Sequence, residues 1–335
     1  MNASKLLLER LDVFVRKITE TCNLIPRTGL MTGKMGIAIL LYHYARYKNE
    51  PEIMDFADQL INSMMQETGL DYGKGLDEGL CGIAWGIDYL IKQQFIQAEV
   101  DIFEEIDACL FQEENRALYL YDLDVEAEKG LYAWNRLFSC QSSEEHIWRQ
   151  RMEKCVSHFH DIWIYRYTNY NLPVFPCRIL IRFFHVCQTL WEHNQYRAET
   201  ESLYEELPEI VKISYREEPC FSDRHMLASL LTGIPVFEKC IPVDDVPPSM
   251  TLADVSNFYL TRLVLGRDIS IPEIADKTML SMAEDRQKID ELLHHLNPDN
   301  AGLGNSVGGL AWAMLQRYNS DKISTHYPSG SSMKY

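Results

Sequence analysis

The sequence predicts an all-α fold made of helical hairpins, each of which begins with a glycine-rich turn. The first observation is self-similarity, because the segments at 29–45, 75–90 and 302–315 share one pattern of glycines. They read GLMTGKMGIAILLYHYA, GLDEGLCGIAWGIDYL and GLGNSVGGLAWAML. The second observation is that each turn runs into an apolar stretch, and the third is that a more amphipathic segment follows the first copy at 51–67. A buried helix paired with an amphipathic one, recurring about every 45 residues, is typical of stacked helical hairpins.

The glycines within a copy have different roles. Gly29, at the first position, is expected to take a left-handed turn that directs the chain into a new helix. Gly33 and Gly36 are three residues apart, so both lie near one face of the first helical turn and let a neighbouring backbone approach closely. The copy at 302–315 keeps the first and third glycines and has Ser306 in place of the middle one.

The rest of the chain carries weaker copies of the same pattern. They lie at 127–134, 177–184 and 222–228, and a divergent hairpin is expected at 243–272. Pro242, Pro247 and Pro248 mark a break around the start of that hairpin. No long linker separates these segments. We therefore expect one domain over 1–318, followed by a polar tail at 319–335.

The composition is that of a globular protein with an excess of acidic residues. The 335 residues are 46% hydrophobic and 24% charged, and the net charge is −17. Such a charge repels phosphate backbones, which argues against nucleic-acid binding, and it favours cationic partners such as a basic peptide. Solubility alone explains the same charge.

The cysteines and the N-terminal segment indicate a reduced, cytoplasmic protein. Nine cysteines are present, an odd number without any CxxC pair, which is unlike the disulfide framework of a short secreted chain. Residues 1–22 are interrupted by charges and contain no signal-peptide core. No apolar run approaches the roughly 20 residues that a membrane span needs.

The repeats resemble those of the lanthionine synthetase C-like family. The resemblance is carried by the three segments quoted above and covers roughly residues 25–318. It implies an α/α toroid, a barrel of six or seven hairpins with inner and outer helices, which is also similar to six-hairpin glycosidases. Active members of the family are zinc enzymes that add a cysteine thiol of a peptide across a dehydrated serine or threonine. Zinc suits this chemistry because it lowers the pKa of a thiol and keeps an open position for the substrate sulfur.

Two short stretches resemble the site motifs of that family. The segment REEPCFSD at 216–223 is similar to RxxxCYGD, which places Arg216 at the arginine and Cys220 at the first zinc ligand. Tyr121 and Asp122 are similar to a Tyr-Asp pair whose aspartate lies near the metal. The resemblance therefore implies Asp122 and Arg216 as catalytic residues and Cys220 as a metal ligand.

The other zinc ligands of the family have no counterpart in this sequence. A CHG turn occurs nowhere, the matching turn carries Pro176 and Cys177, and Cys240 is followed by Ile241. A catalytic zinc site takes three protein ligands, and one can be named here. We therefore expect no cofactor, zinc being the one candidate with a partial ligand set, unless a residue within 243–300 completes it.

The sequence leaves three functions open. The first is a divergent family member of a ribosomal-peptide modification system, which binds a peptide substrate or a modification enzyme without zinc-dependent cyclisation. The second is an active, thioether-forming cyclase with a rearranged site of Asp122, Arg216 and Cys220. The third is a sugar-acting enzyme, which requires two carboxylates facing one cleft, such as Asp77 and Asp122 at the starts of inner helices. Acids at such places also serve as helix caps.

Overall fold

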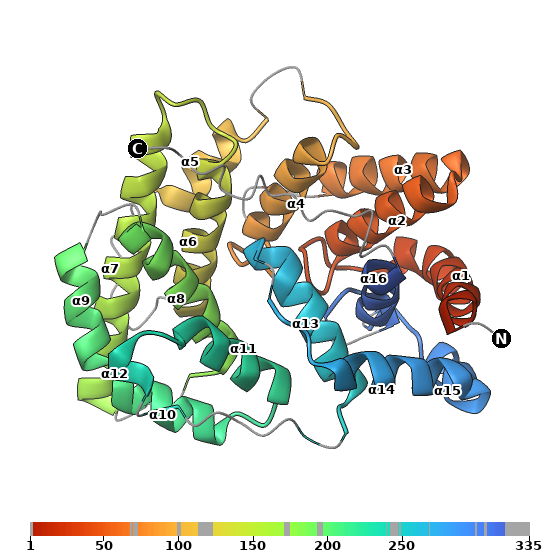
Figure 1. Cartoon of the computed structure of the whole chain (residues 1–335). Helices are drawn as coiled ribbons and strands as arrows, with labels where there is room; N and C mark the ends of the chain where they lie inside the picture. The colour runs from red at the N-terminus through yellow and green to blue at the C-terminus, as the bar shows by residue number, and fades with distance from the viewer. Residues whose placement is uncertain are drawn as a thin grey trace. The chain divides into compact units, whose positions relative to one another are not determined.

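The computed structural model is all-helical in the part of the chain that it describes, which confirms the predicted α class (Figure 1). The described residues are 3–67, 69, 73–98, 102–112, 123–170, 175–192, 197–238, 240–241, 247, 249–267, 269–298, 300–304 and 307–318. Among them, no helix is long and apolar enough to cross a membrane. The expected tail at 319–335 lies outside these residues.

Contacts group the chain into two compact units. The first unit comprises 1–27, 32–62 and 245–335, and the second comprises 28–31 and 63–244. Each unit therefore combines segments that are distant in the sequence. The single domain over 1–318 stays a prediction.

Two apolar helices, α2 and α16, are the most buried elements of the first unit. Its elements are α1 (Ala3–Thr21), η1 (Cys22–Leu24), α2 (Lys34–Lys48), most of α3 (Pro51–Glu67), α13 (Leu252–Leu265), α14 (Glu273–Glu284), α15 (Arg286–His294) and α16 (Val307–Tyr318). Helix α16 packs against α1, α2 and α13, and α14 packs against α1, α13 and α15. Residues 34–45 of α2 and 307–315 of α16 are buried without exception. The apolar runs of the first and last repeat copies therefore form a core.

Helix α13 begins and ends at defined signals. The Thr251 hydroxyl accepts the Asp254 N–H at 3.0 Å, and the Asp254 carboxylate accepts the Thr251 N–H at 3.2 Å, which is a capping box. Gly266 ends the helix with a φ of 58°, a left-handed conformation that glycine adopts without strain. The divergent hairpin expected at 243–272 thus contains a well-capped helix.

The second unit repeats the pairing of a buried helix with a neighbouring helix. Its elements are α4 (Leu80–Lys92), α5 (Glu104–Phe111), α6 (Leu123–Leu137), α7 (Glu145–Tyr170), α8 (Cys177–Glu192), α9 (Arg197–Glu206), α10 (Pro208–Glu217), α11 (Phe221–Leu231) and α12 (Pro235–Glu238). Helix α4 contacts α6, α6 contacts α8, and α8 contacts α11, while α7 packs against both α6 and α8. The weaker copies at 127–134, 177–184 and 222–228 lie on α6, α8 and α11. The helical repeat therefore runs through this unit.

The turn of the first repeat copy docks onto the turn of the second. The Leu30 N–H donates to the Leu76 carbonyl at 3.1 Å. A Cβ at Gly29 would overlap the backbone of Glu78, and a Cβ at Gly82 would overlap the Leu76 carbonyl. The predicted left-handed conformation of Gly29 is wrong, since the described glycines with positive φ lie elsewhere. Close approach of another backbone is the reason that these positions require glycine.

Candidate functional site

The site residues singled out from the sequence all fall in the second unit. Asp122 lies outside the described residues. Arg216 is in the last turn of α10, where its side chain is 68% exposed and pairs with Glu217 at 3.6 Å. Cys220 is the N-cap of α11, and its sulfur lies 3.0 Å from the Ser222 hydroxyl. Arg216 and Cys220 are thus each engaged by a neighbour in their own segment.

Glu218 joins the N-terminal ends of α8 and α11. Its carboxylate accepts the Cys177 N–H at 2.9 Å and the Cys220 N–H at 3.1 Å. Cys177, the first residue of α8, is buried. Burial raises the pKa of its thiol above the usual range, and the charge of Glu218 raises it further. A thiol that stays protonated is a weak nucleophile and a weak metal ligand, so this corner is organised as two capped helix starts.

The described residues do not fit a catalytic zinc site. Within them, no group of three or more His, Cys, Asp or Glu side chains is placed to hold a metal ion. His294 and His295, which fall within 243–300, lie at the end of α15 with ring centroids 5.4 Å apart. A catalytic zinc site needs three protein ligands. Within the described segments, the motif at 216–223 supplies one candidate, Cys220. The absence of a cofactor stays a prediction.

Three charged side chains meet where the turn before α4 reaches α6 and α8, and we call Asp77, Glu128 and Arg182 the turn cluster. Arg182, on α8, donates to Asp77 Oδ1 at 2.7 Å and also to Glu128 on α6. The second carboxylate oxygen of Glu128 accepts the Leu76 N–H at 2.6 Å. Arg182 is 7% exposed and Glu128 is 3% exposed, whereas Asp77 is half-buried. One guanidinium group therefore links α8 both to α6 and to the turn.

Burial and charge act in opposite directions on the pKa values of the turn cluster. Burial raises the pKa of Glu128 to about 7, against the opposing charge of Arg182. Burial alone would lower the pKa of Arg182, but the charges of Asp77 and Glu128 outweigh it and raise that pKa. Removing one partner from a buried network of this kind is costly, because a charge is left without compensation. The turn cluster therefore holds the turn in one position.

A more accessible ion pair adjoins the turn cluster. Asp124 in the first turn of α6 and Arg178 in the first turn of α8 approach to 3.7 Å, with side chains 34% and 51% exposed. The charge of Asp124 also acts on the pKa values of Glu128 and Arg182, which places it near them. The turn cluster and this pair together bring three carboxylates and two guanidinium groups to the starts of neighbouring buried helices.

Each described carboxylate of this region lies beside an arginine, with Arg182 shared between Asp77 and Glu128. Arg182 pairs with Asp77 at 2.7 Å, and Arg178 lies 3.7 Å from Asp124. Glycoside hydrolysis needs one carboxyl group as an acid and a second as a base or nucleophile on either side of the scissile bond. The pair expected from the sequence, Asp77 and Asp122, includes a residue outside the described segments, so a sugar-acting site stays a prediction.

Sequence reasoning missed Glu128 and Arg182. Both are charged residues inside helical runs that are otherwise largely buried, namely EAEKGLYAW on α6 and CRILIRFF on α8. A charged residue within such a run is a signal for a buried ion pair, because charged side chains are seldom fully buried unless they are paired. The signal does not name the partner, which for Arg182 and Asp77 lies 105 residues away in the sequence.

Comparisons of the chain with protein-family models, with curated proteins and with solved structures find no match. The likeness to the lanthionine synthetase C-like family therefore rests on the glycine-turn motifs and on the short stretches around Asp122 and Cys220.

Proposed function

We propose that this protein is a divergent lanthionine synthetase C-like protein of a ribosomal-peptide modification system. In this proposal its helical hairpins form an α/α toroid that binds a peptide substrate or a modification enzyme and does not carry out zinc-dependent cyclisation. The support from the sequence is a repeat pattern that is kept while the CHG ligands are missing. The support from the structure is the chain of contacts from α4 through α6 and α8 to α11, with a glycine turn before α4 and the Glu218 carboxylate at the starts of α8 and α11.

The accessible pair next to the turn cluster is the observation that carries the binding role. Asp124 and Arg178 present partly exposed charges on two neighbouring helices, and the adjoining Arg182 and Glu128 of the turn cluster are buried and paired. A polar surface whose support is already ordered loses little conformational entropy when a ligand binds. This arrangement suits recognition of an extended polar chain across the helix starts.

Burial and pairing of the titratable groups at this end favour binding over catalysis. Burial keeps the Cys177 thiol protonated, and Arg182 engages the carboxylates of both Asp77 and Glu128. Nucleophilic and general-base catalysis both need a reactive group that a substrate can reach, whereas Glu128, whose pKa burial raises to about 7, is 3% exposed and held by Arg182 and the Leu76 N–H. Carboxylates outnumber guanidinium groups here, and the whole chain carries a net charge of −17. A basic peptide therefore fits this surface better than an acidic one.

The binding role can be tested with two fluorescein-labelled peptides of equal length, one rich in lysine and one rich in glutamate. We expect the lysine-rich peptide to bind more tightly in fluorescence anisotropy and to weaken as salt is raised. Asp124→Asn should weaken it by about twofold to fivefold, since one exposed charge contributes up to about 1 kcal/mol. Asp161→Asn is the matched control, because Asp161 is an exposed acid on α7 of the same unit. Equal weakening by both substitutions would contradict a localised site.

Elemental analysis of untagged protein tests the part of the proposal that concerns zinc. We expect less than one zinc per chain, with no change on Cys220→Ala. One tightly bound zinc that disappears in Cys220→Ala would overturn this part and return the active cyclase to first place. That alternative, with Asp122, Arg216 and Cys220 as its site, and the sugar-acting alternative both depend on Asp122, which the structure does not describe.

A further inference from the structure

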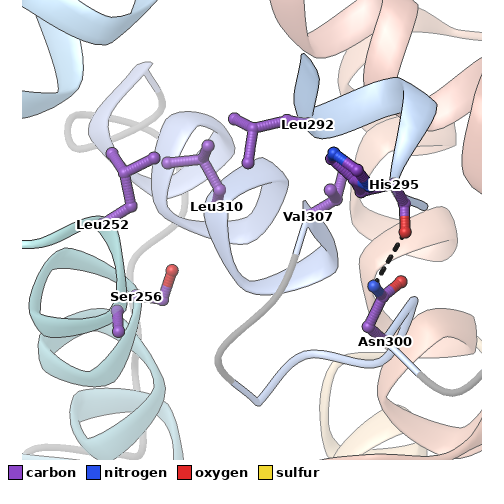
Figure 2. Close-up of a pocket in the computed structure, with 8 residues that line it drawn as sticks. Leu252, Ser256, Leu292, His295, Asn300, Val307 and Leu310 are labelled. Carbon is purple, nitrogen blue, oxygen red and sulfur yellow. Dashed lines mark hydrogen bonds between the residues drawn. The ribbon is translucent and has the colours of Figure 1, made fainter. Parts of the chain in front are cut away.

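A pocket of about 140 Å³ lies within the first unit, where the N-terminal halves of α13 and α16 meet the end of α15. Its walls are apolar and come from Leu252, Leu292, Val307 and Leu310. Figure 2 shows the side chains of Leu252, Leu292 and Leu310 directed toward one space between the three helices. Polar groups are confined to the base of the pocket and its rim.

Small residues at the base leave room for the pocket. Ser256 and Ala253 line it from α13, and Ser256 is buried. A Cβ at Gly309 of α16 would come within 3.0 Å of the Ser256 Cβ, so the two helices approach each other closely at this point. The pocket thus lies beside a tight crossing of α13 and α16. Close packing of these helices keeps the pocket walls from moving inward to fill the space.

A short polar loop holds the rim. The Asn300 side chain donates to the His295 carbonyl at 2.9 Å and accepts the Asn297 N–H at 2.8 Å. These two bonds fix the loop after α15, and Figure 2 shows the His295 ring beside Val307 at the edge of the pocket. His295 is exposed, so the edge that it forms is reached from solvent.

The rim continues onto an acidic helix face. His295 also borders a shallow depression over α15, which carries Asp290 and Glu291 together with Arg286. Gln287 donates to Glu291 at 2.9 Å, which holds that carboxylate on the face. A group that enters the pocket past His295 therefore has two carboxylates and one guanidinium group beside it.

We propose that this pocket binds one benzene-sized apolar side chain, such as phenylalanine or leucine, from a peptide that carries a basic residue next to it. The volume supports this size, because an apolar cavity of about 150 Å³ stays dry and takes up benzene. The charge of the neighbouring face supports the basic residue, which would lie near Asp290 and Glu291. The inference rests on the proposed function in assuming a peptide ligand, but it uses a different site in the other unit.

The test uses two labelled nonapeptides that differ at one position, Gly-Ser-Lys-Lys-Phe-Lys-Lys-Ser-Gly and the same sequence with alanine in place of phenylalanine. We expect the phenylalanine peptide to bind wild-type protein about tenfold or more tightly, as full burial of one aromatic side chain implies. Ala253→Leu places a larger side chain in the pocket and should reduce this preference to below about twofold. Thr261→Leu is the matched control, because Thr261 is half-buried on the same helix and outside the pocket. Thermal unfolding of both variants checks that they fold.

The outcomes separate this inference from the proposed function. Three results would contradict a side-chain-binding role for the pocket. They are equal binding of both peptides to wild-type protein, binding of neither peptide, and a preference for the phenylalanine peptide that survives in Ala253→Leu. If both peptides bind equally well and both are weakened by Asp124→Asn, the proposed function stands while the pocket fails. If the preference is lost in Ala253→Leu and neither peptide responds to Asp124→Asn, the pocket stands and the proposed surface on the second unit fails.

Discussion

His43 couples the stability of the first unit to pH. It lies on α2 with 3% of its surface exposed, and its ring meets the Trp312 ring of α16 edge to face with centroids 5.3 Å apart. Burial lowers the pKa of His43 from 6.5 to about 3, and the charge of Arg46 adds to this effect. The imidazole is therefore neutral in the folded protein throughout the range in which an unfolded histidine becomes charged.

The size of the effect follows from the two pKa values. Between pH 6.5 and 3 the unfolded state binds more protons than the folded state, so the free energy of unfolding rises with pH in this window and falls on acidification. At pH 5.0 the unfolded histidine is about 1.5 pH units below its pKa, and each unit is worth about 1.4 kcal/mol. His43 should therefore cost about 2 kcal/mol of stability between pH 7.5 and pH 5.0.

Urea unfolding followed by circular dichroism at pH 7.5, 6.0 and 5.0 measures this loss. His43→Phe keeps an aromatic ring against Trp312 and cannot titrate, so its stability should fall by about 2 kcal/mol less than that of wild type over the same range. His43→Leu should show the same reduced pH dependence, whatever constant offset each substitution adds through packing. Wild-type pH dependence in both variants would show that His43 is not held neutral by burial, and the reasoning would fail.

Three further changes test the packing. Gly82→Ala should cost about 3 kcal/mol or more in urea unfolding, because its Cβ would overlap backbone, whereas Gly73→Ala, with open space around its Cβ, should change stability by less than about 0.5 kcal/mol. Arg182→Met should cost about 3 to 5 kcal/mol, and adding Glu128→Leu should recover part of it, since the double variant no longer leaves that buried carboxylate unpaired. Thr251→Ala removes the capping box of α13 and should cost about 1 kcal/mol, measured in the same way. A loss in Gly73→Ala equal to that in Gly82→Ala, or no recovery in the double variant, would contradict these assignments.

Local pattern accounts for the features that could be predicted from the sequence. The apolar runs that follow Gly36 and Gly82 are buried on all sides as α2 and α4, and the amphipathic segment at 51–67 is α3. Neighbours along one helix decide these properties, so a single sequence contains the information. The reason for glycine at Gly29 could not be predicted in the same way, because the backbone that approaches it belongs to Glu78 in another repeat.

The candidate site could be predicted far less well, because it depends on pairs between helices. A motif indicates Arg216, but its guanidinium group is exposed at the end of α10 beside Glu217. Arg182 has no motif around it, yet it joins Glu128, 54 residues away, and Asp77, 105 residues away. The sequence shows that a charge falls within a buried run, but only the packing of α6 on α8 shows which carboxylate meets it.

Two separate constraints therefore act on the turn that precedes α4. Gly79 at the end of the turn and Gly82 in the first turn of α4 are required by backbone contact, since a Cβ at either position would overlap a carbonyl of the turn, that of Gly73 or Leu76. The charged side chains around the turn depend on each other, because Arg182 on α8 pairs with both Asp77 of the turn and Glu128 on α6. The first constraint fixes the glycines of the turn and the second fixes its charged side chains, so the glycine pattern alone indicates how the turn packs and not what chemistry its side chains support.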